Sequence, residues 1–289
     1  MAGTREISRR IKSVKNIGQI TKAMELVSAS KMRRSQEAAV GGRRYSQTLH
    51  TMLANLVAHT TAEHHPLLQQ SEQLGNGSHK VLMIVFSPDK GLCGGLISNV
   101  LREIQQFGQT HPHVTYVTMG KRGRDGVIRM GGEVLADFPL HDRSQLRHVL
   151  PLTKVAINAY LHEGYQEVII AHTRFINILV QKPFMHQILP LSMSIEKIES
   201  ENSDLDSEFL FEPSVEAVLE QLLPRYVEMT IYQALLEAQA SEHSARMVAM
   251  KNAGDNARDI QDELTLTKNQ LRQASITAEL AEISSGAAA

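Results

Sequence analysis

The sequence has no tryptophan, a single cysteine and only 4% aromatic residues. A lone cysteine, Cys93, excludes an internal disulfide and a zinc site built from paired cysteines, and it fits a reducing compartment. The scarcity of aromatic rings argues against nucleic-acid binding by base stacking. The longest apolar run, VLMIVF at 81–86, is too short to cross a membrane, and charges from Arg5 onward exclude the apolar core of a signal peptide. We therefore expect a soluble chain.

Charge is balanced overall but divided unevenly along the sequence. The formal net charge of -1 argues against a nucleic-acid-binding protein. Residues 1–44 nevertheless carry eleven Lys or Arg against three Glu, whereas 196–220 carry nine acidic residues and one Lys. We expect the basic N-terminal segment to bind acidic surfaces. The alternative is that it acts as a basic coiled-coil tether for nucleic acid.

The stretch 214–285 reads as one uninterrupted helix, several times the usual globular length. Apolar residues recur along it at steps of three and four, which is typical of a coiled-coil seam. Such a helix cannot bury its seam inside one compact core, so it needs a partner helix or a sleeve of other proteins. The expected seam consists of Leu219, Leu222, Tyr226, Met229, Leu236, Ala240, Met247, Met250, Ala253, Ala257, Ile260, Leu264, Leu271, Ala274 and Ala278.

A second helix is predicted at 4–59, and it supplies the partner. Its small residues, such as Ala23, Ser28 and Ala29, permit close approach to the C-terminal helix. The two helices should pair antiparallel, because both must leave the same domain between them. The apolar stripe expected to face the partner consists of Ile7, Ile11, Val14, Ile17, Ile20, Met24 and Val27.

Between the helices the pattern changes to short strands alternating with helices, which predicts a small Rossmann-like α/β domain with a mainly parallel sheet. The fold class is therefore a long antiparallel coiled coil with an inserted α/β domain. We divide the chain into an N-terminal coiled-coil helix at 1–75, the α/β domain at 76–207 and a C-terminal coiled-coil helix at 208–289. Strands are expected at 81–86, 114–119, 133–138, 167–173 and 176–181, the last two as a possible hairpin, and helices at 96–107, 123–130 and 144–162.

The turn SPDKGLCGG at 87–95 is the one candidate ligand site in the sequence. Its glycines precede a helix, so an anion site is conceivable, but it matches neither the P-loop nor the dinucleotide fingerprint. A tight strand-to-helix turn is the simpler interpretation, with Cys93 as a small packed thiol. The thirteen histidines show no metal-binding spacing, and no catalytic constellation is evident. We expect no catalytic, cofactor or metal site; the alternative is a nucleotide-binding α/β enzyme with a helical oligomerisation arm.

Four sequence runs carry a more specific signal. They are EISRRIKSVKNIGQITKAMELVSASKMRR at 6–34, DKGLCGG at 89–95, ARMVAMKNAGDNA at 245–257 and RQASITAELAEISSGA at 272–287. Together they closely resemble the gamma subunits of bacterial rotary F-type ATP synthases, in the same order and over essentially the whole chain.

The resemblance implies a non-catalytic central-stalk rotor that couples proton flow to conformational change in a catalytic head. The implied partners are the alpha and beta subunits of the head, the epsilon subunit and the c-subunit ring, with no nucleic acid. The implied location is peripheral, on the cytoplasmic face of the bacterial inner membrane. The resemblance assigns head contacts to Arg246, Gln273, Thr277, Met24, Lys22 and Lys31, and ring or epsilon contacts to Phe209, Phe211 and Glu212.

Overall fold

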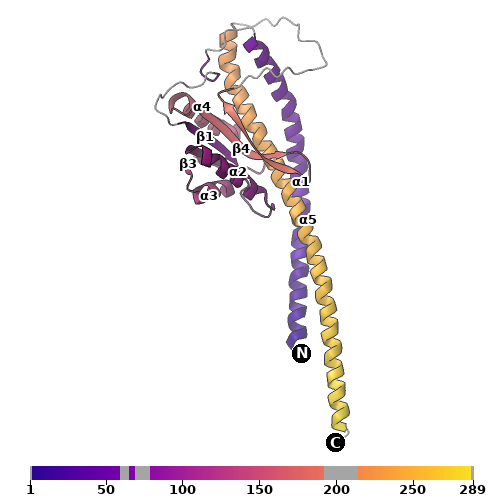
Figure 1. Cartoon of the computed structure of the whole chain (residues 1–289). Helices are drawn as coiled ribbons and strands as arrows, with labels where there is room; N and C mark the ends of the chain where they lie inside the picture. Colours follow the sequence, from indigo (N-terminus) through magenta and orange to yellow (C-terminus); the bar gives the residue numbers. More distant parts are fainter. Residues whose placement is uncertain (1, 59–64, 69–78, 192–213, 288–289) are drawn as a thin grey trace. The chain divides into compact units, whose positions relative to one another are not determined.

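The computed structural model describes residues 2–58, 65–68, 79–191 and 214–287 (Figure 1). Two long helices, α1 (Ala2–Ala58) and α5 (Val215–Ala287), flank the rest of the chain in sequence. Their bounds agree within two residues with the helices predicted from periodicity, which confirms both of those predictions.

Contacts within the chain divide it into two compact units. Met1–Ser30 and Arg246–Ala289 form one, called here the helical unit, and Lys31–Ala245 form the other, called the sheet unit. Both boundaries fall inside a long helix, so α1 and α5 each contribute to both units. The predicted division into 1–75, 76–207 and 208–289 separates the long helices from the α/β segment rather than grouping residues by contact. It remains a prediction.

In the helical unit, α1 and α5 pack antiparallel through small residues. A Cβ added to Gly18 would lie 3.7 Å from the Cβ of Ala257, and one added to Gly254 would lie 3.3 Å from Oγ1 of Thr21. Residue numbers thus rise on one helix as they fall on the other. A glycine inside a helix weakens it, but here Gly254 lets the two backbones approach closely.

This close packing moves part of the predicted apolar stripe of α1 off the seam, while Ile7, Ile11, Val14 and Met24 stay half-buried. The positions of α1 that are buried in the helical unit are Thr21 and Ser28, with Gly18 half-buried on the same face. Ile17, Ile20 and Val27 are instead 50%, 58% and 56% exposed, so their assignment to the seam was wrong. On α5, Met250 and Ala257 are buried as predicted, whereas the predicted seam residues Ile260, Leu271, Ala274 and Ala278 are exposed.

The sheet unit contains one five-stranded sheet in the order β3-β2-β1-β4-β5. The first four strands in sequence pair in parallel, and β5 pairs antiparallel with β4 as an edge hairpin. The strands are β1 (Lys80–Phe86), β2 (His113–Met119), β3 (Glu133–Phe138), β4 (Glu167–Phe175) and β5 (Gln181–Leu189), and the helices between them are α2 (Leu96–Thr110), α3 (Lys121–Arg129) and α4 (Leu146–His162). The predicted Rossmann-like α/β domain is confirmed.

Both faces of the central strand β1 are buried, as its continuous apolar sequence predicts. Leu82, Ile84 and Phe86 face a core shared with α4, α5 and the end of α1. Met83 and Val85 face the opposite core, which is closed by α2 and α3. The α/β domain therefore uses a segment of α5 as one of its own covering helices.

The predicted strand at 176–181 was wrong. Residues 176–180 form the turn of the hairpin, and the strand itself is β5. The Asn177 side chain accepts hydrogen bonds from the backbone N–H groups of Leu179 and Val180, at 2.9 and 2.8 Å. An asparagine that bonds its own backbone in this way favours a turn over a strand, despite the apolar residues around it.

Gly120→Ala should destabilise the α/β domain. Gly120 has a φ of +114°, and a Cβ at this position would clash with the carbonyl oxygen of Ser87. We expect a loss of about 2–4 kcal/mol in the free energy of unfolding, measured by urea denaturation of the full chain.

Gly131→Ala is the matched control. Its φ is +79°, but nothing lies within 4 Å of an added Cβ, so only backbone strain of about 1–2 kcal/mol is expected. Equal denaturation midpoints for the two variants would contradict the role assigned to the Gly120–Ser87 contact.

Candidate functional site

The first three residues of the turn at 87–95 cap the N-terminus of helix α3. Ser87 Oγ accepts a hydrogen bond from the Gly123 N–H at 2.6 Å, and the Pro88 carbonyl accepts one from the Arg122 N–H at 3.1 Å. The Asp89 carboxylate accepts the Lys121 N–H at 2.9 Å. The first N–H groups of α3 are thereby satisfied, with a negative charge already at the helix N-terminus. Residues 87–89 of the turn are thus engaged in capping α3, which favours the interpretation of a structural turn.

In an open α/β sheet, ligands bind beyond the carboxyl ends of the strands, at the point where the strand order reverses. In this sheet that point lies between β1 and β4, because α2 and α3 cover one face while α4 covers the other. The space there is only about 10 Å³ and is lined by Ser87, Thr173, Leu235, Ala238 and Gln239, among others. It could hold one water molecule at most, since a water needs roughly 10–15 Å³. Residues of α5 fill the crevice in which a nucleotide would bind.

Buried hydrogen bonds fix α5 in this crevice. Ser241 Oγ donates to the Thr173 carbonyl at 2.9 Å, and Gln239 Nε2 donates to the His141 carbonyl at 2.7 Å. Ser241 and Gln239 are both buried. Each bond satisfies a backbone carbonyl of the α/β domain with a side chain of α5. The helix is therefore joined to the carboxyl edge of the sheet by specific polar contacts.

Apolar packing secures the same segment of α5. Leu223, Val227, Ile231 and Leu235 recur every fourth residue and are almost completely buried in the main core. Burying each of these side chains contributes roughly 1.5–3 kcal/mol. The α/β domain therefore holds this part of α5 as a permanent element of its core.

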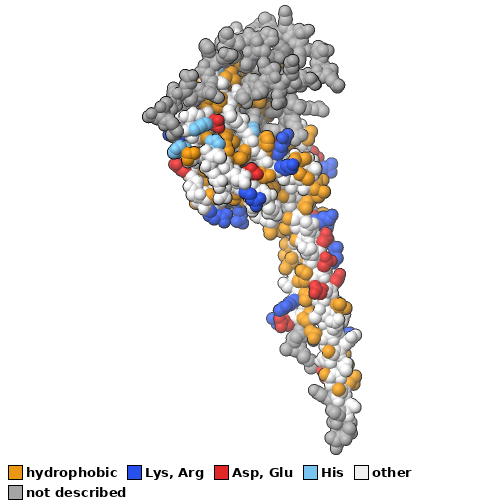
Figure 2. All heavy atoms as spheres, viewed as in Figure 1, with side chains coloured by type: hydrophobic (Ala, Val, Ile, Leu, Met, Phe, Trp, Pro, Cys, Tyr) orange, Lys and Arg blue, Asp and Glu red, His pale blue; other side chains and the backbone are white. Residues whose placement is uncertain are grey.

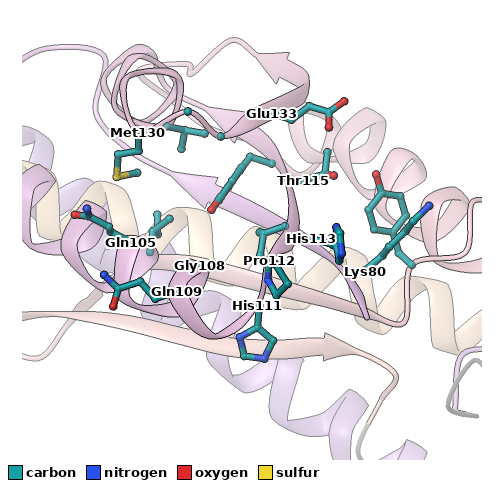
Figure 3. A pocket seen from close by; sticks show the side chains of 17 residues that line it. Lys80, Gln105, Gly108, Gln109, His111, Pro112, His113, Thr115, Met130 and Glu133 are labelled. Atoms are coloured by element: carbon teal, nitrogen blue, oxygen red, sulfur yellow. The ribbon is translucent and has the colours of Figure 1, made fainter. Parts of the chain in front are cut away.

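A second cavity lies at the opposite edge of the sheet. It has a volume of about 700 Å³ and opens at the amino ends of β1, β2 and β3, beside the end of α2. Lys80 and His113 lie near each other in it, and Glu133 stands apart from them (Figure 3). Within the described residues, no three His, Cys, Asp or Glu side chains could hold a metal ion.

The residues predicted to contact the head are found in both units. In the helical unit, Lys22 is exposed and pairs with Glu25 at 2.9 Å, and Met24 is half-buried. Gln273 and Thr277 are exposed and one turn apart, and the Thr277 hydroxyl donates to the Gln273 carbonyl at 2.9 Å.

The remaining predicted contacts are less accessible or lie elsewhere. Arg246 is only 9% exposed, and Lys31 of the sheet unit donates to Asp142 at 2.8 Å. This hydrogen bond lowers the pKa of the Asp142 carboxyl group. Phe209, Phe211 and Glu212 lie outside the described residues. All of these contacts remain predictions.

Sequence reasoning missed the exposed apolar residues of the helical unit. On α1 they are Ile17, Ile20, Leu26 and Val27, which periodicity alone had largely assigned to the seam. Gly18, Thr21 and Ser28 also recur at steps of three and seven. This run of small residues is the signal that could have identified the true seam.

Comparison with known proteins gives a consistent result. The family model described as ATP synthase matches residues 3–289. The chain is 44% identical over 294 residues to the ATP synthase gamma chain of Roseiflexus sp. (strain RS-1), covering 100% of this chain and 99% of that one. It is 42% identical over 295 residues to the ATP synthase gamma chain of Cupriavidus pinatubonensis, covering 100% of both.

Solved structures with a similar fold come from mitochondrial ATP synthases. One, from a Tetrahymena thermophila central stalk and c-ring, has a TM-score of 0.59 at 22% identity and covers 81% of this chain and 99% of that one. Another, from an Euglena gracilis OSCP/F1/c-ring structure, has a TM-score of 0.67 at 19% identity, with coverage of 98% and 92%. Among the described helices, none contains an apolar segment able to cross a membrane.

Ser241→Ala should weaken the attachment of α5 to the sheet. The substitution leaves the buried Thr173 carbonyl without the hydroxyl that donates to it, and this should cost about 1–3 kcal/mol of unfolding free energy in a urea titration.

Thr265→Ala removes a comparable hydroxyl from an exposed position, where the side chain donates to the Gln261 carbonyl at 2.7 Å. Water can replace that bond, so we expect a change within about 0.5 kcal/mol. If Ser241→Ala were as mild as this control, the polar attachment of α5 would be unimportant.

Proposed function

Because the chain belongs to the ATP synthase gamma chain family, we propose that it turns as the central shaft of the complex and couples proton movement to the catalytic head. It is a non-catalytic subunit of that complex, which agrees with the filled crevice at the carboxyl edge of the sheet. The stalk structures with the same fold support this role.

The observation that carries the proposal is the apolar surface of the helical unit. Ile17, Ile20, Leu26 and Val27 on α1 are exposed, as are Ile260, Leu266, Leu271, Ile276 and Leu280 on α5. Figure 2 shows apolar side chains interspersed with charged ones along the two helices. So many large apolar side chains on a surface indicate that other proteins cover them. A surrounding head of alpha and beta subunits is the partner that the family provides.

The two-helix shaft also has the asymmetry that coupling requires. Its two helices differ in sequence and carry exposed apolar residues, the Lys22–Glu25 pair on α1 and the Asp255–Arg258 pair on α5. Chemically identical subunits around it therefore meet different surfaces, and each orientation favours a different conformation in each subunit. Driving a site from almost fully closed to almost fully open takes about 5.5 kcal/mol of differential interaction, which several such contacts can supply.

We also infer specific partners and a location. The similar structures come from assemblies with a c-ring and F1, which for this chain correspond to the c-subunit ring and the alpha/beta head, with epsilon as a further neighbour. The complex would hold the chain peripherally at the cytoplasmic face of the bacterial inner membrane. Phe209, Phe211 and Glu212 are the proposed contacts to the ring and epsilon.

The residues proposed to contact the head differ in how accessible they are to a partner subunit. Gln273 and Thr277 are exposed and can donate or accept hydrogen bonds to a partner. Lys31 can bind a head carboxylate only in competition with Asp142. Arg246 as a whole residue is only 9% exposed in the isolated chain, so its contact with the head requires a change of rotamer or acts through neighbouring side chains.

Gln273→Ala in the assembled complex tests the head contact. Loss of a hydrogen bond worth about 0.5–1.5 kcal/mol should reduce assembly, or reduce the protons pumped per ATP hydrolysed, while the chain stays folded. Proton pumping and ATPase activity would be measured together in membrane vesicles.

Gln270→Ala is the matched control, an exposed glutamine three residues earlier on the same helix. It should leave assembly and pumping close to those of the unmodified complex. Identical pumping ratios and yields for both variants would argue against Gln273 as a head contact.

A further inference from the structure

Two histidines and a glutamate meet beneath the β4–β5 hairpin of the sheet unit. His172 on β4 is only 2% exposed, and its Nε2 lies 3.7 Å from Oε2 of Glu237 on α5. His186 on β5 is half-buried, and its ring centroid lies 5.7 Å from that of His172. These three residues, called here the histidine cluster, join three elements at one buried point.

The imidazole rings in the cluster are incompletely hydrogen-bonded. The Nδ1 atoms of His172 and His186 are both buried and have no hydrogen-bond partner among the described residues. The Phe184 ring lies 5.7 Å from the His172 ring and stacks on the His186 ring at 5.2 Å, so part of the surroundings is apolar. Buried polar atoms without partners are uncommon and costly, so packing alone does not account for two histidines here.

Charged and titratable groups of both signs surround the His186 ring. Those that face it are His172 and Arg174 from β4 and Glu237 from α5, which also accepts a hydrogen bond from Gln233 at 3.3 Å. Across the sheet, α2 packs on the opposite face of β5, where Val100 and Ile104 form an apolar cluster with Met185. Helix α1 contributes the uncharged Gln36, Ala39 and Val40 to the adjoining groove. One carboxylate thus faces two imidazoles and a guanidinium.

Burial is the largest cause that lowers the pKa of His186, to about 4 from 6.5. The charge of His172 lowers it further, Glu237 opposes the shift, and Arg174 adds a smaller lowering effect. The closed cluster therefore favours a neutral His186 ring.

The cluster lies where an edge strand is attached to α5. Strand β5 pairs only with β4, and the hairpin turn is held by Ser244 of α5, which donates to the Ile178 carbonyl at 2.8 Å. A groove of about 360 Å³, lined by Glu237 and Arg174 among others, adjoins the cluster. Residues 181–187 can therefore open locally into water without unfolding the central strands.

We propose that the histidine cluster is a proton-sensitive latch, in which protonation of His186 releases strand β5 from the sheet edge and from α5. In the open hairpin His186 is solvated and regains its ordinary pKa. The closed state is fully favoured above pH 6.5 and loses stability as the pH falls toward 4, because only the open state readily binds the proton. Opening should become about tenfold more favourable for each pH unit below 6.5 within this window.

Opening of the hairpin would weaken the attachment of the α/β domain to α5. Acid would loosen the hairpin attachment at Glu237 and Ser244, while the core bonds of Ser241 and Gln239 persist. Acidification would thus remove some of the contacts between the domain and the long helix without unfolding the domain. This latch adds a regulatory property to the shaft role and does not depend on it.

Hydrogen exchange measured by mass spectrometry on the full chain tests the latch. Exchange in peptides covering 181–187 would be compared at pH 7.5 and 5.5, after correction for the intrinsic pH dependence of amide exchange. We expect about a tenfold larger opening constant at pH 5.5 in the unmodified chain. The difference should vanish in His186→Gln, and in His186→Phe as a second variant that keeps the apolar packing.

His111→Gln is the control, because His111 also stacks on a phenylalanine, Phe107, but lies outside the hairpin. It should retain the full tenfold response. An unchanged opening constant in the unmodified chain between the two pH values would overturn the proposal, and so would a response that persists in both His186 variants. Since this readout does not involve rotation, either failure would leave the proposed function standing.

Discussion

The packing of α5 into the crevice between β1 and β4 determines what the α/β domain can do. This position is where an open parallel sheet normally binds a ligand, and Leu235, Ala238 and Gln239 fill it from the helix. The same contacts occupy a potential binding site and attach α5 to the sheet. A domain that resembles nucleotide-binding folds in its topology thereby becomes the mount of a long helix, and its turn at 87–95 serves to cap α3.

A second constraint acts in the helical unit, where glycine, alanine, threonine and serine bring the two backbones together. Because Gly18, Thr21 and Ser28 occupy the seam, Ile17, Ile20 and Val27 of α1 are exposed beside it. The result is a thin pair of helices with an apolar surface, which suits a shaft inside a collar of other subunits. The small residues on the seam thus account both for the tight packing of the two helices and for the apolar residues exposed beside it.

The sequence predicted most of the architecture because its signals were long and periodic. The limits of α1 and α5, the antiparallel pairing and the parallel sheet followed from apolar spacing and from the alternation of strands and helices. The seam was misassigned because hydrophobicity alone ranks Ile17 and Ile20 above Gly18 and Thr21, whereas close packing favours the smaller residues. The turn at 176–180 was misread because its apolar residues resemble a strand, and only Asn177 indicates the turn. The filled crevice and the histidine cluster depend on tertiary contacts between separate elements, many of them between residues roughly 50–150 positions apart, which spacing cannot reveal.

Rotation of the chain within its complex is the most direct test. Cys93 is buried, so a cysteine introduced at the exposed Arg129 of α3 would give a selective attachment point for an optical probe. With the head fixed to a surface and ATP supplied, the account predicts that the probe turns continuously in one direction. A probe that stays still while the same complexes hydrolyse ATP would contradict the central claim that this chain is the rotating shaft.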